Sequence, residues 1–132
     1  VAGAAETRGG SCVLSLTFIG SSICIPNYHV VGVAKSALES STRYLASELG
    51  KHNVRVNAIS PGPINTAAAR GIPNFRDFEK HVKKNTLLNR NTSLEDVASV
   101  ATFLASEEAA SITGQTLFID CGFNVSSSIH TS

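Results

Sequence analysis

Three short apolar runs alternate with two long amphipathic segments, and this order restricts the chain to few folds. Each run is rich in β-branched or aromatic residues and is flanked by Gly, Pro or Ser. The runs cover residues 12–18, 54–60 and 116–120. From Val30 to Leu49, apolar and small residues recur every three or four positions, which predicts a helix that Gly50 ends. A second helix is predicted to begin after Ser93, whose hydroxyl can cap it. This alternation predicts an α/β domain with a parallel sheet.

The predicted sheet is small. A parallel sheet normally has both faces covered and more than three strands. A weaker, basic amphipathic helix is expected from Phe75 to about Lys84. The 132 residues suit one domain. We therefore expect one domain that is part of something larger.

Composition excludes several classes of protein. Hydrophobic residues make up 42% of the chain, which is too many for a disordered protein. The net charge of +1 gives no electrostatic footprint of a nucleic-acid binder, and no apolar stretch approaches the ~18 residues of a membrane span. The first residues do not form a signal peptide, and the lack of any Met suggests a processed, split or truncated chain.

Cysteine and histidine positions give no metal site and no disulfide framework. Cys12, Cys24 and Cys121 are an odd number at scattered spacings, which favours a reducing compartment. Cys12 and Cys121 are predicted to be buried in the strand-like runs. The four histidines show no metal-ligand spacing, so we expect surface or helix positions for them. They are His29, His52, His81 and His130.

Tyr28 and Lys35 are the first candidate catalytic pair. They lie seven residues apart, so on a continuous helix they share a face, with Cα atoms about 10.5 Å apart. The ammonium of Lys35 is expected to reach back toward the phenol and to lower its pKa. Such a tyrosine can donate to an oxygen that gains charge during a reaction. On spacing alone, the alternative is a half-buried tyrosine beside a lysine with no catalytic role.

The loop after the second apolar run is the second candidate feature. It reads Ser60-Pro61-Gly62-Pro63-Ile64-Asn65-Thr66. A Pro-Gly-Pro segment there offers stiff backbone with free amides and carbonyls, at the edge where α/β sheets bind ligands. The hydroxyl of Thr66 suits a phosphate.

Together these motifs resemble the short-chain dehydrogenase/reductase superfamily. Within it, the chain is most similar to the enoyl-acyl-carrier-protein reductases of bacterial-type (type II) fatty acid synthesis, from about Ser11 to Val125. Most of the superfamily has Lys four residues after the catalytic Tyr, where Gly32 stands here, and the longer gap to Lys35 marks the enoyl reductase branch. The resemblance implies a Rossmann-like, doubly wound parallel sheet. Residues 1–132 would be its carboxyl-terminal half, with the last three strands, and the Gly-rich nucleotide fingerprint is absent from them.

The resemblance also implies roles for individual residues. The family reduces the trans-2 double bond of an enoyl thioester with NADH, or alternatively NADPH. Tyr28 would stabilise the enolate oxygen and Lys35 would hold the nicotinamide ribose. Phe18 stands where many members have a second tyrosine, and it would pack on the substrate or the nicotinamide. The residues implied to bind cofactor are Gly62, Pro63, Ile64 and Thr66, and those implied to cover the acyl chain are Ala68, Ala69, Ile72 and Phe75.

Several alternatives and partners remain open at this stage. Ser15 stands where other superfamily members have a catalytic serine, although a strand position is the plainer interpretation. The basic stretch at Lys80, Lys83 and Lys84, with Arg76, is either a solvated helix face or a surface that steers acidic acyl carrier protein.

The implied assembly is a homotetramer, or a complex with a missing amino-terminal half. The implied location is a bacterial cytoplasm or a plastid-type organelle. Another superfamily reductase, such as a 3-oxoacyl reductase, or a non-catalytic fragment that serves subunit assembly are the competing functions. The family often ends its last strand Asp-Gly-Gly, whereas this chain has Asp120-Cys121-Gly122.

Overall fold

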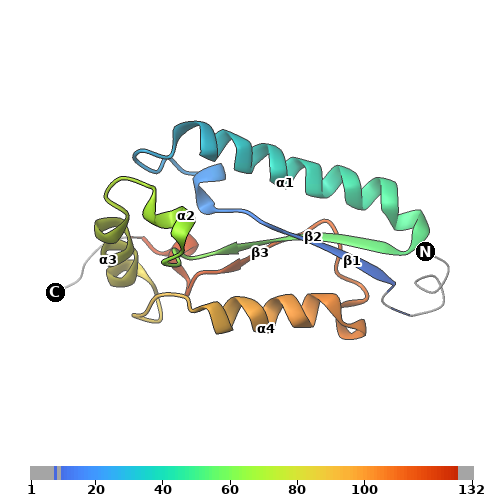
Figure 1. Ribbon diagram of the computed structural model, residues 1–132. Coiled ribbons are helices and arrows are strands. Elements are labelled where there is room, and N and C mark those ends of the chain that lie inside the picture. The colour runs from blue at the N-terminus through green and yellow to red at the C-terminus, as the bar shows by residue number, and fades with distance from the viewer. Residues whose placement is uncertain (1–7, 9, 128–132) are drawn as a thin grey trace.

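The computed structural model describes residue 8 and residues 10–127. Three parallel strands form one sheet in the order β1 (Ser11–Leu16), β2 (Val54–Pro61) and β3 (Thr116–Ile119). The long helix α1 (His29–Leu49) lies over one face and α4 (Leu94–Ala105) over the other (Figure 1). The predicted α/β domain with a parallel sheet is therefore confirmed.

The central strand β2 is buried on both faces. Leu16 at the end of β1 pairs with Ile59, and Ala58 pairs with Thr116 of β3. Ile59 packs with Leu104 and Ala109 in the core on the α4 side. Since successive side chains of a strand point to opposite faces, Ala58 lies on the α1 side. Covering both faces explains why every residue from 55 to 60 is buried, including the polar side chains of Arg55, Asn57 and Ser60.

β1 is an edge strand in the described part of the chain, because it pairs only with β2. Val13 is 43% exposed and Leu16 is 56% exposed. The edge strand therefore leaves apolar side chains in contact with solvent.

The face that α1 turns toward the sheet differs from the predicted apolar stripe. Val30 and Val33, at 79% and 70% exposed, lie on the outside, whereas Gly32, Thr42 and Ala46 are buried. Small residues allow the helix to approach the sheet and the segment before it closely, so side-chain size outweighs hydropathy here.

The end of α1 also follows another mechanism than expected. The helix ends at Leu49, as predicted, but Gly50 keeps a right-handed conformation with φ −59°. A short 3-10 turn, Gly50–His52, follows it, and Asn53 takes the left-handed conformation with φ 56°. Asparagine tolerates this region better than most residues, so Asn53 rather than Gly50 supplies the left-handed turn.

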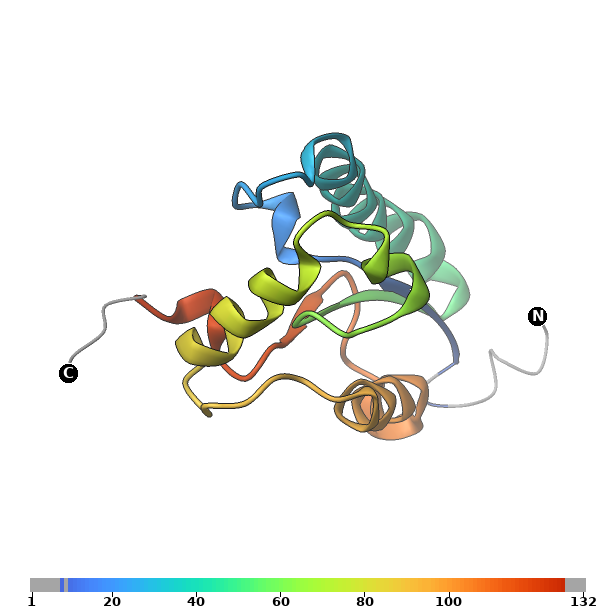
Figure 2. The same cartoon turned by 60° about the vertical axis from the view of Figure 1, so that its left-hand side comes forward.

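Two further helices lie beyond the carboxyl ends of the strands. They are α2 (Ala67–Arg70) and α3 (Phe75–Asn85). Figures 1 and 2 place both near the start of α1, at the same end of the sheet. This is the end at which α/β sheets bind ligands.

α4 begins with the predicted cap. The side chain of Ser93 accepts from the N–H of Asp96, and Asp96 accepts from the N–H of Ser93, which completes a capping box. Within residues 8 and 10–127, no helix is both long and apolar enough to cross a membrane.

Candidate active site

A cleft of about 1030 Å³ opens at the carboxyl end of the sheet. Its walls are mostly apolar and come from the ends of β1 and β2, the starts of α1 and α4, and helices α2 and α3. The cleft brings together all of the residues to which the family resemblance assigned a catalytic, cofactor or substrate role, whereas the alternative candidate Ser15 does not line it. They are Phe18, Tyr28, Lys35, Gly62, Pro63, Ile64, Thr66, Ala68, Ala69, Ile72 and Phe75.

Tyr28 lies at the N-cap of α1 and is 7% exposed. Its ring packs directly on Gly20, because a Cβ built on that glycine would lie 2.3 Å from the tyrosine Cδ1. Burial raises the pKa of the phenol, since removal from water disfavours the phenolate. The expectation that Lys35 lowers this pKa is therefore wrong, and at neutral pH the phenol is a proton donor.

Lys35 points to the end of β1. Its Nζ donates to the carbonyl oxygen of Leu16 at 2.9 Å. An ammonium has three donors, so two stay available toward the cleft that Lys35 lines.

An aromatic wall stands beside Tyr28. The ring centroid of Phe18 lies 5.4 Å from that of Tyr28 and 6.0 Å from that of Phe78, in edge-to-face geometry both times. Phe78 also lines the cleft, although it was not predicted as a site residue. Its signal is the spacing of three residues from Phe75, on the apolar side of an amphipathic helix.

Two further cleft residues were also missed as part of a site. His81 is exposed on α3, as expected of a helix histidine, yet it lines the cleft and its ring lies 6.5 Å from that of Phe123. Phe123 reaches the cleft because Asp120 accepts hydrogen bonds from the N–H groups of Gly122 and Asn124, at 3.0 and 2.9 Å. Asp120 thus shapes the turn after β3.

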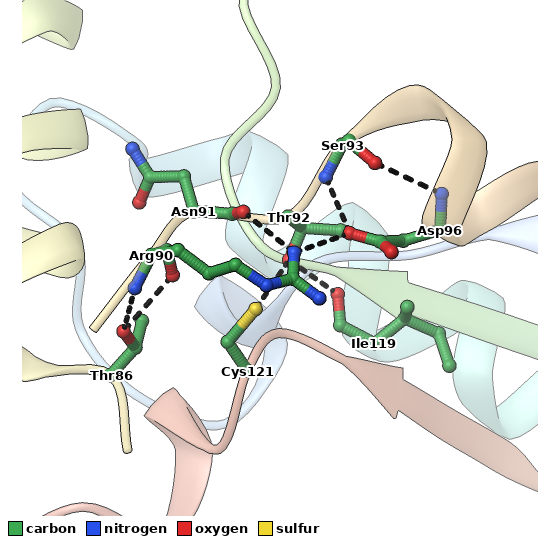
Figure 3. A network of polar contacts seen from close by, with 8 residues as sticks. All are labelled: Thr86, Arg90, Asn91, Thr92, Ser93, Asp96, Ile119 and Cys121. Atoms are coloured by element: carbon green, nitrogen blue, oxygen red, sulfur yellow. Dashed lines mark hydrogen bonds and ion pairs between the residues drawn. The ribbon is translucent and has the colours of Figure 1, made fainter. Parts of the chain in front are cut away.

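The loop after β2 is fastened more tightly than its composition suggests. The N–H of Gly62 donates to Ile119 at 3.0 Å, so the expectation of a free amide there is wrong. Thr92 donates to the same carbonyl at 2.8 Å (Figure 3). A Cβ on Gly62 would lie 2.8 Å from the Thr92 hydroxyl, so only glycine fits between the loop and β3.

Ile64 and Thr66 close a tight turn in the same loop. The N–H of Thr66 donates to the carbonyl of Ile64 at 2.8 Å, and the Thr66 hydroxyl accepts from the N–H of Ala69 at 3.1 Å. The hydroxyl proton of Thr66 is still able to donate to a ligand. The backbone conformation of Ile64 is thereby fixed at the cleft wall.

The remaining described candidate residues do not line the cleft. The Ser15 hydroxyl lies 3.5 Å from that of Thr42 and does not line the cleft, which favours the strand interpretation. Cys121 lies after β3 with φ 56°, so its predicted strand position is wrong. Among the described residues no cluster could hold a metal ion, and His130 lies outside them.

Comparison with known proteins identifies the family. The family model described as "Enoyl-(Acyl carrier protein) reductase" matches residues 2–124. The chain belongs to this family. It is 45% identical over 119 residues to the enoyl-[acyl-carrier-protein] reductase [NADH] FabI of Bacillus subtilis (strain 168), covering 90% of this chain and 46% of that protein.

Solved structures of the same family share the fold. The enoyl-acyl carrier protein reductase of Bacillus cereus, with NADP+ and indole naphthyridinone, has a TM-score of 0.85 and 41% identity, over 87% of this chain and 45% of that one. The Anaplasma phagocytophilum reductase in complex with NAD has a TM-score of 0.81 and 40% identity, over 95% of this chain and 44% of that one. The sheet is thus Rossmann-like, and the chain spans less than half the length of these relatives.

Proposed function

We propose that this chain carries the tyrosine and lysine of an NADH-dependent enoyl-acyl-carrier-protein reductase, with NADPH as the alternative cofactor. The observation that carries the proposal is one apolar cleft, at the carboxyl edge of a parallel sheet, lined by Tyr28, Lys35 and the loop after β2. Membership of the reductase family supports it. So do the [NADH] in the name of the Bacillus subtilis relative and the NAD in the Anaplasma phagocytophilum structure.

The residues present fit the nicotinamide end of such a cofactor. The mostly apolar cleft is bordered by a cation, two hydroxyls and a fixed backbone turn, which come from Lys35, Tyr28, Thr66 and Ile64. NADH supplies a hydride when it is bound. In the proposal Lys35 holds the ribose hydroxyls with the donors that Leu16 does not take. The turn from Gly62 to Thr66 borders the carboxamide.

Tyr28 would act on the thioester oxygen. Reduction at C3 of the enoyl group places negative charge on that oxygen, and a neutral phenol can donate a hydrogen bond that strengthens as the charge grows. Burial keeps the phenol protonated, as this role requires. Phe18 has no hydroxyl, so it would contribute packing against the substrate rather than a second hydrogen bond.

Helices α2 and α3 would cover the acyl chain. Ala68, Ala69 and Ile72 present small or apolar side chains to the cleft, and Phe75 is 8% exposed at the start of α3. An apolar cover excludes water from the reacting atoms.

Acyl carrier protein is the proposed macromolecular partner. Lys80, Lys83 and Lys84 lie on α3, next to the cleft-lining residues, and border a small hollow of about 550 Å³ with Asn89. Lysines on this helix would steer an acidic carrier toward the cleft. Charge reversal at Lys83 and Lys84 should weaken binding of the carrier at low salt, and unchanged binding across a salt series would remove this part of the proposal.

Residues 1–132 would form the carboxyl-terminal half of the Rossmann-type domain. The open edge of β1 and coverage of 46% of the Bacillus subtilis relative support this assignment. Assembly would complete the enzyme, either with the remaining half or within a homotetramer. A bacterial cytoplasm or a plastid-type organelle is the proposed location.

A chimera tests the reaction. The segment of the Bacillus subtilis relative that matches this chain is replaced by this chain, and oxidation of NADH is followed with crotonyl and acetoacetyl thioesters. We expect reduction of the crotonyl thioester only. Tyr28→Phe should lower kcat about 100-fold while NADH affinity stays nearly constant. Tyr44→Phe is the matched control, because Tyr44 is 73% exposed on the outside of α1.

The two alternatives give different results. Reduction of the acetoacetyl thioester would favour a 3-oxoacyl reductase. A folded chimera that reduces neither substrate would favour a fragment that serves subunit assembly. A chimera whose turnover survives Tyr28→Phe would contradict the role of the phenol.

A further inference from the structure

A single carboxylate oxygen accepts hydrogen bonds from both ends of residues 17–21, the first part of the segment that joins β1 to α1. Thr17 donates from its hydroxyl to Oε1 of Glu39 at 2.7 Å, and Ser21 donates to the same oxygen at 2.6 Å. Glu39 is half-buried on α1, and Thr17 is only 3% exposed. The contact is therefore part-buried, with the Thr17 end in the interior of the domain.

Residues 17–21 cover one side of the Tyr28 ring. Phe18 places its ring edge-to-face on the phenol ring, and Gly20 packs against the same ring. α1 holds the segment at two further points. A Cβ on Gly32 would lie 2.7 Å from the carbonyl oxygen of Gly20, and the Ser36 hydroxyl donates to the carbonyl of Ser21 at 2.5 Å.

We propose that Glu39 is a positioning residue, which holds Phe18 and Gly20 against Tyr28 by accepting hydrogen bonds from Thr17 and Ser21. Hydrogen bonds to a carboxylate are shorter and stronger than those between neutral groups. Loss of the acceptor would leave the buried Thr17 hydroxyl without its partner, which favours movement of the segment. Phe18 would then lose its edge-to-face contact with the ring of Tyr28.

The fluorescence of Tyr28 can report this movement. It contains two tyrosines and no tryptophan, so Tyr44→Phe leaves Tyr28 as the sole tyrosine emitter. Acrylamide quenching at neutral pH then measures how well residues 17–21 cover the ring. In this background, Glu39→Ala should raise the quenching constant about twofold or more, because two hydrogen bonds are lost together. Glu39→Gln, which keeps an acceptor oxygen, should stay close to the parent.

Glu48→Ala is the matched control, because Glu48 is exposed on the same helix and its loss changes the net charge equally. Equal quenching in the parent and in folded Glu39→Ala would overturn the proposal. If Glu39→Ala does not fold, Thr17→Val and Ser21→Ala each remove one donor. Both should then raise quenching, and no change in either variant would also overturn it.

The kinetic arm rests on the proposed function. In the chimera, Glu39→Ala should lower kcat for crotonyl reduction about tenfold with little change in KM for NADH, and Glu39→Gln should recover most of it. A fall in kcat without increased quenching would contradict positioning. An inactive chimera with Glu39 intact would contradict the reductase assignment alone, since the quenching arm needs no reaction.

Discussion

The ammonium of Lys35 lies 2.9 Å from the carbonyl oxygen of Leu16, the last residue of β1. This hydrogen bond directs the lysine side chain from α1 toward the carboxyl end of β1. Tyr28 lies in the same cleft, but burial rather than the lysine charge determines the direction of its pKa shift. The pair therefore offers a neutral phenol and a cation as separate groups at one site.

Tyr28 is expected to titrate above the ordinary range of tyrosine, because burial disfavours its phenolate. The Tyr44→Phe variant isolates this phenol for alkaline ultraviolet difference titration. Since the folded pKa lies above the unfolded one, the stability from the protonated phenol is fully present below the unfolded value of about 10 and is lost as the pH rises through the folded value. Tyr28→Phe should remove that part of the alkaline decline in the free energy of unfolding. A midpoint at or below that of free tyrosine would contradict the burial argument.

Replacing glycine with alanine should change the free energy of unfolding in opposite directions at Gly32, within α1, and at Gly50, just after its end. A Cβ at Gly32 would lie 2.7 Å from the backbone oxygen of Gly20, so Gly32→Ala should cost about 1–3 kcal/mol and displace residues 17–21. Gly50 has a right-handed conformation and no heavy atom within 4 Å of an added Cβ, so Gly50→Ala should stabilise by about 0.4–1 kcal/mol. Urea unfolding measures both. Equal effects at the two positions would show that helix propensity, rather than the close approach to Gly20, governs Gly32.

Much of this arrangement could be predicted from local signals. The alternation of apolar runs gives the strand order along the chain, and the bounds of β2 and α1 agree with their patterns to within one residue. Tyr28 and Lys35 meet in one cleft because the spacing of helical residues is a local property. The Ser93 cap can likewise be predicted from the sequence, because it depends on residues only three positions apart.

Contacts between distant segments could not be predicted in this way. The hydrogen bonds from Lys35 to Leu16 and from Thr17 to Glu39 join residues 19 and 22 positions apart, and no periodicity encodes them. The apolar stripe of α1 misleads for a related reason. Close approach of the helix to its neighbours requires small residues, so Gly32 is buried while Val33 stays 70% exposed.

Asp96 should contribute to stability only above strongly acidic pH. Hydrogen bonds from Arg90 first, and then from Ser93, lower the pKa of its carboxyl to about 2 (Figure 3). Because the folded pKa lies below the unfolded one, the contribution is present above about pH 4 and is lost as the pH falls through about 2. NMR titration of the carboxyl measures the pKa, and Asp96→Asn should flatten this part of the acid profile. Glu95→Gln, in the same first turn, is the control, and an equal flattening there would contradict the specific role of the capping box.

Cys121 occupies a backbone conformation that favours glycine. Its φ is 56°, in the left-handed region where a Cβ is unfavourable, while its carbonyl accepts from the N–H groups of Leu87 and Leu88. Cys121→Gly should therefore raise the free energy of unfolding by about 1 kcal/mol and leave those two hydrogen bonds in place. Cys121→Ala is the control, because it removes the sulfur and keeps the Cβ. If the alanine variant is as stable as the glycine variant, the sulfur rather than the backbone accounts for the change, and the strain argued from φ is absent.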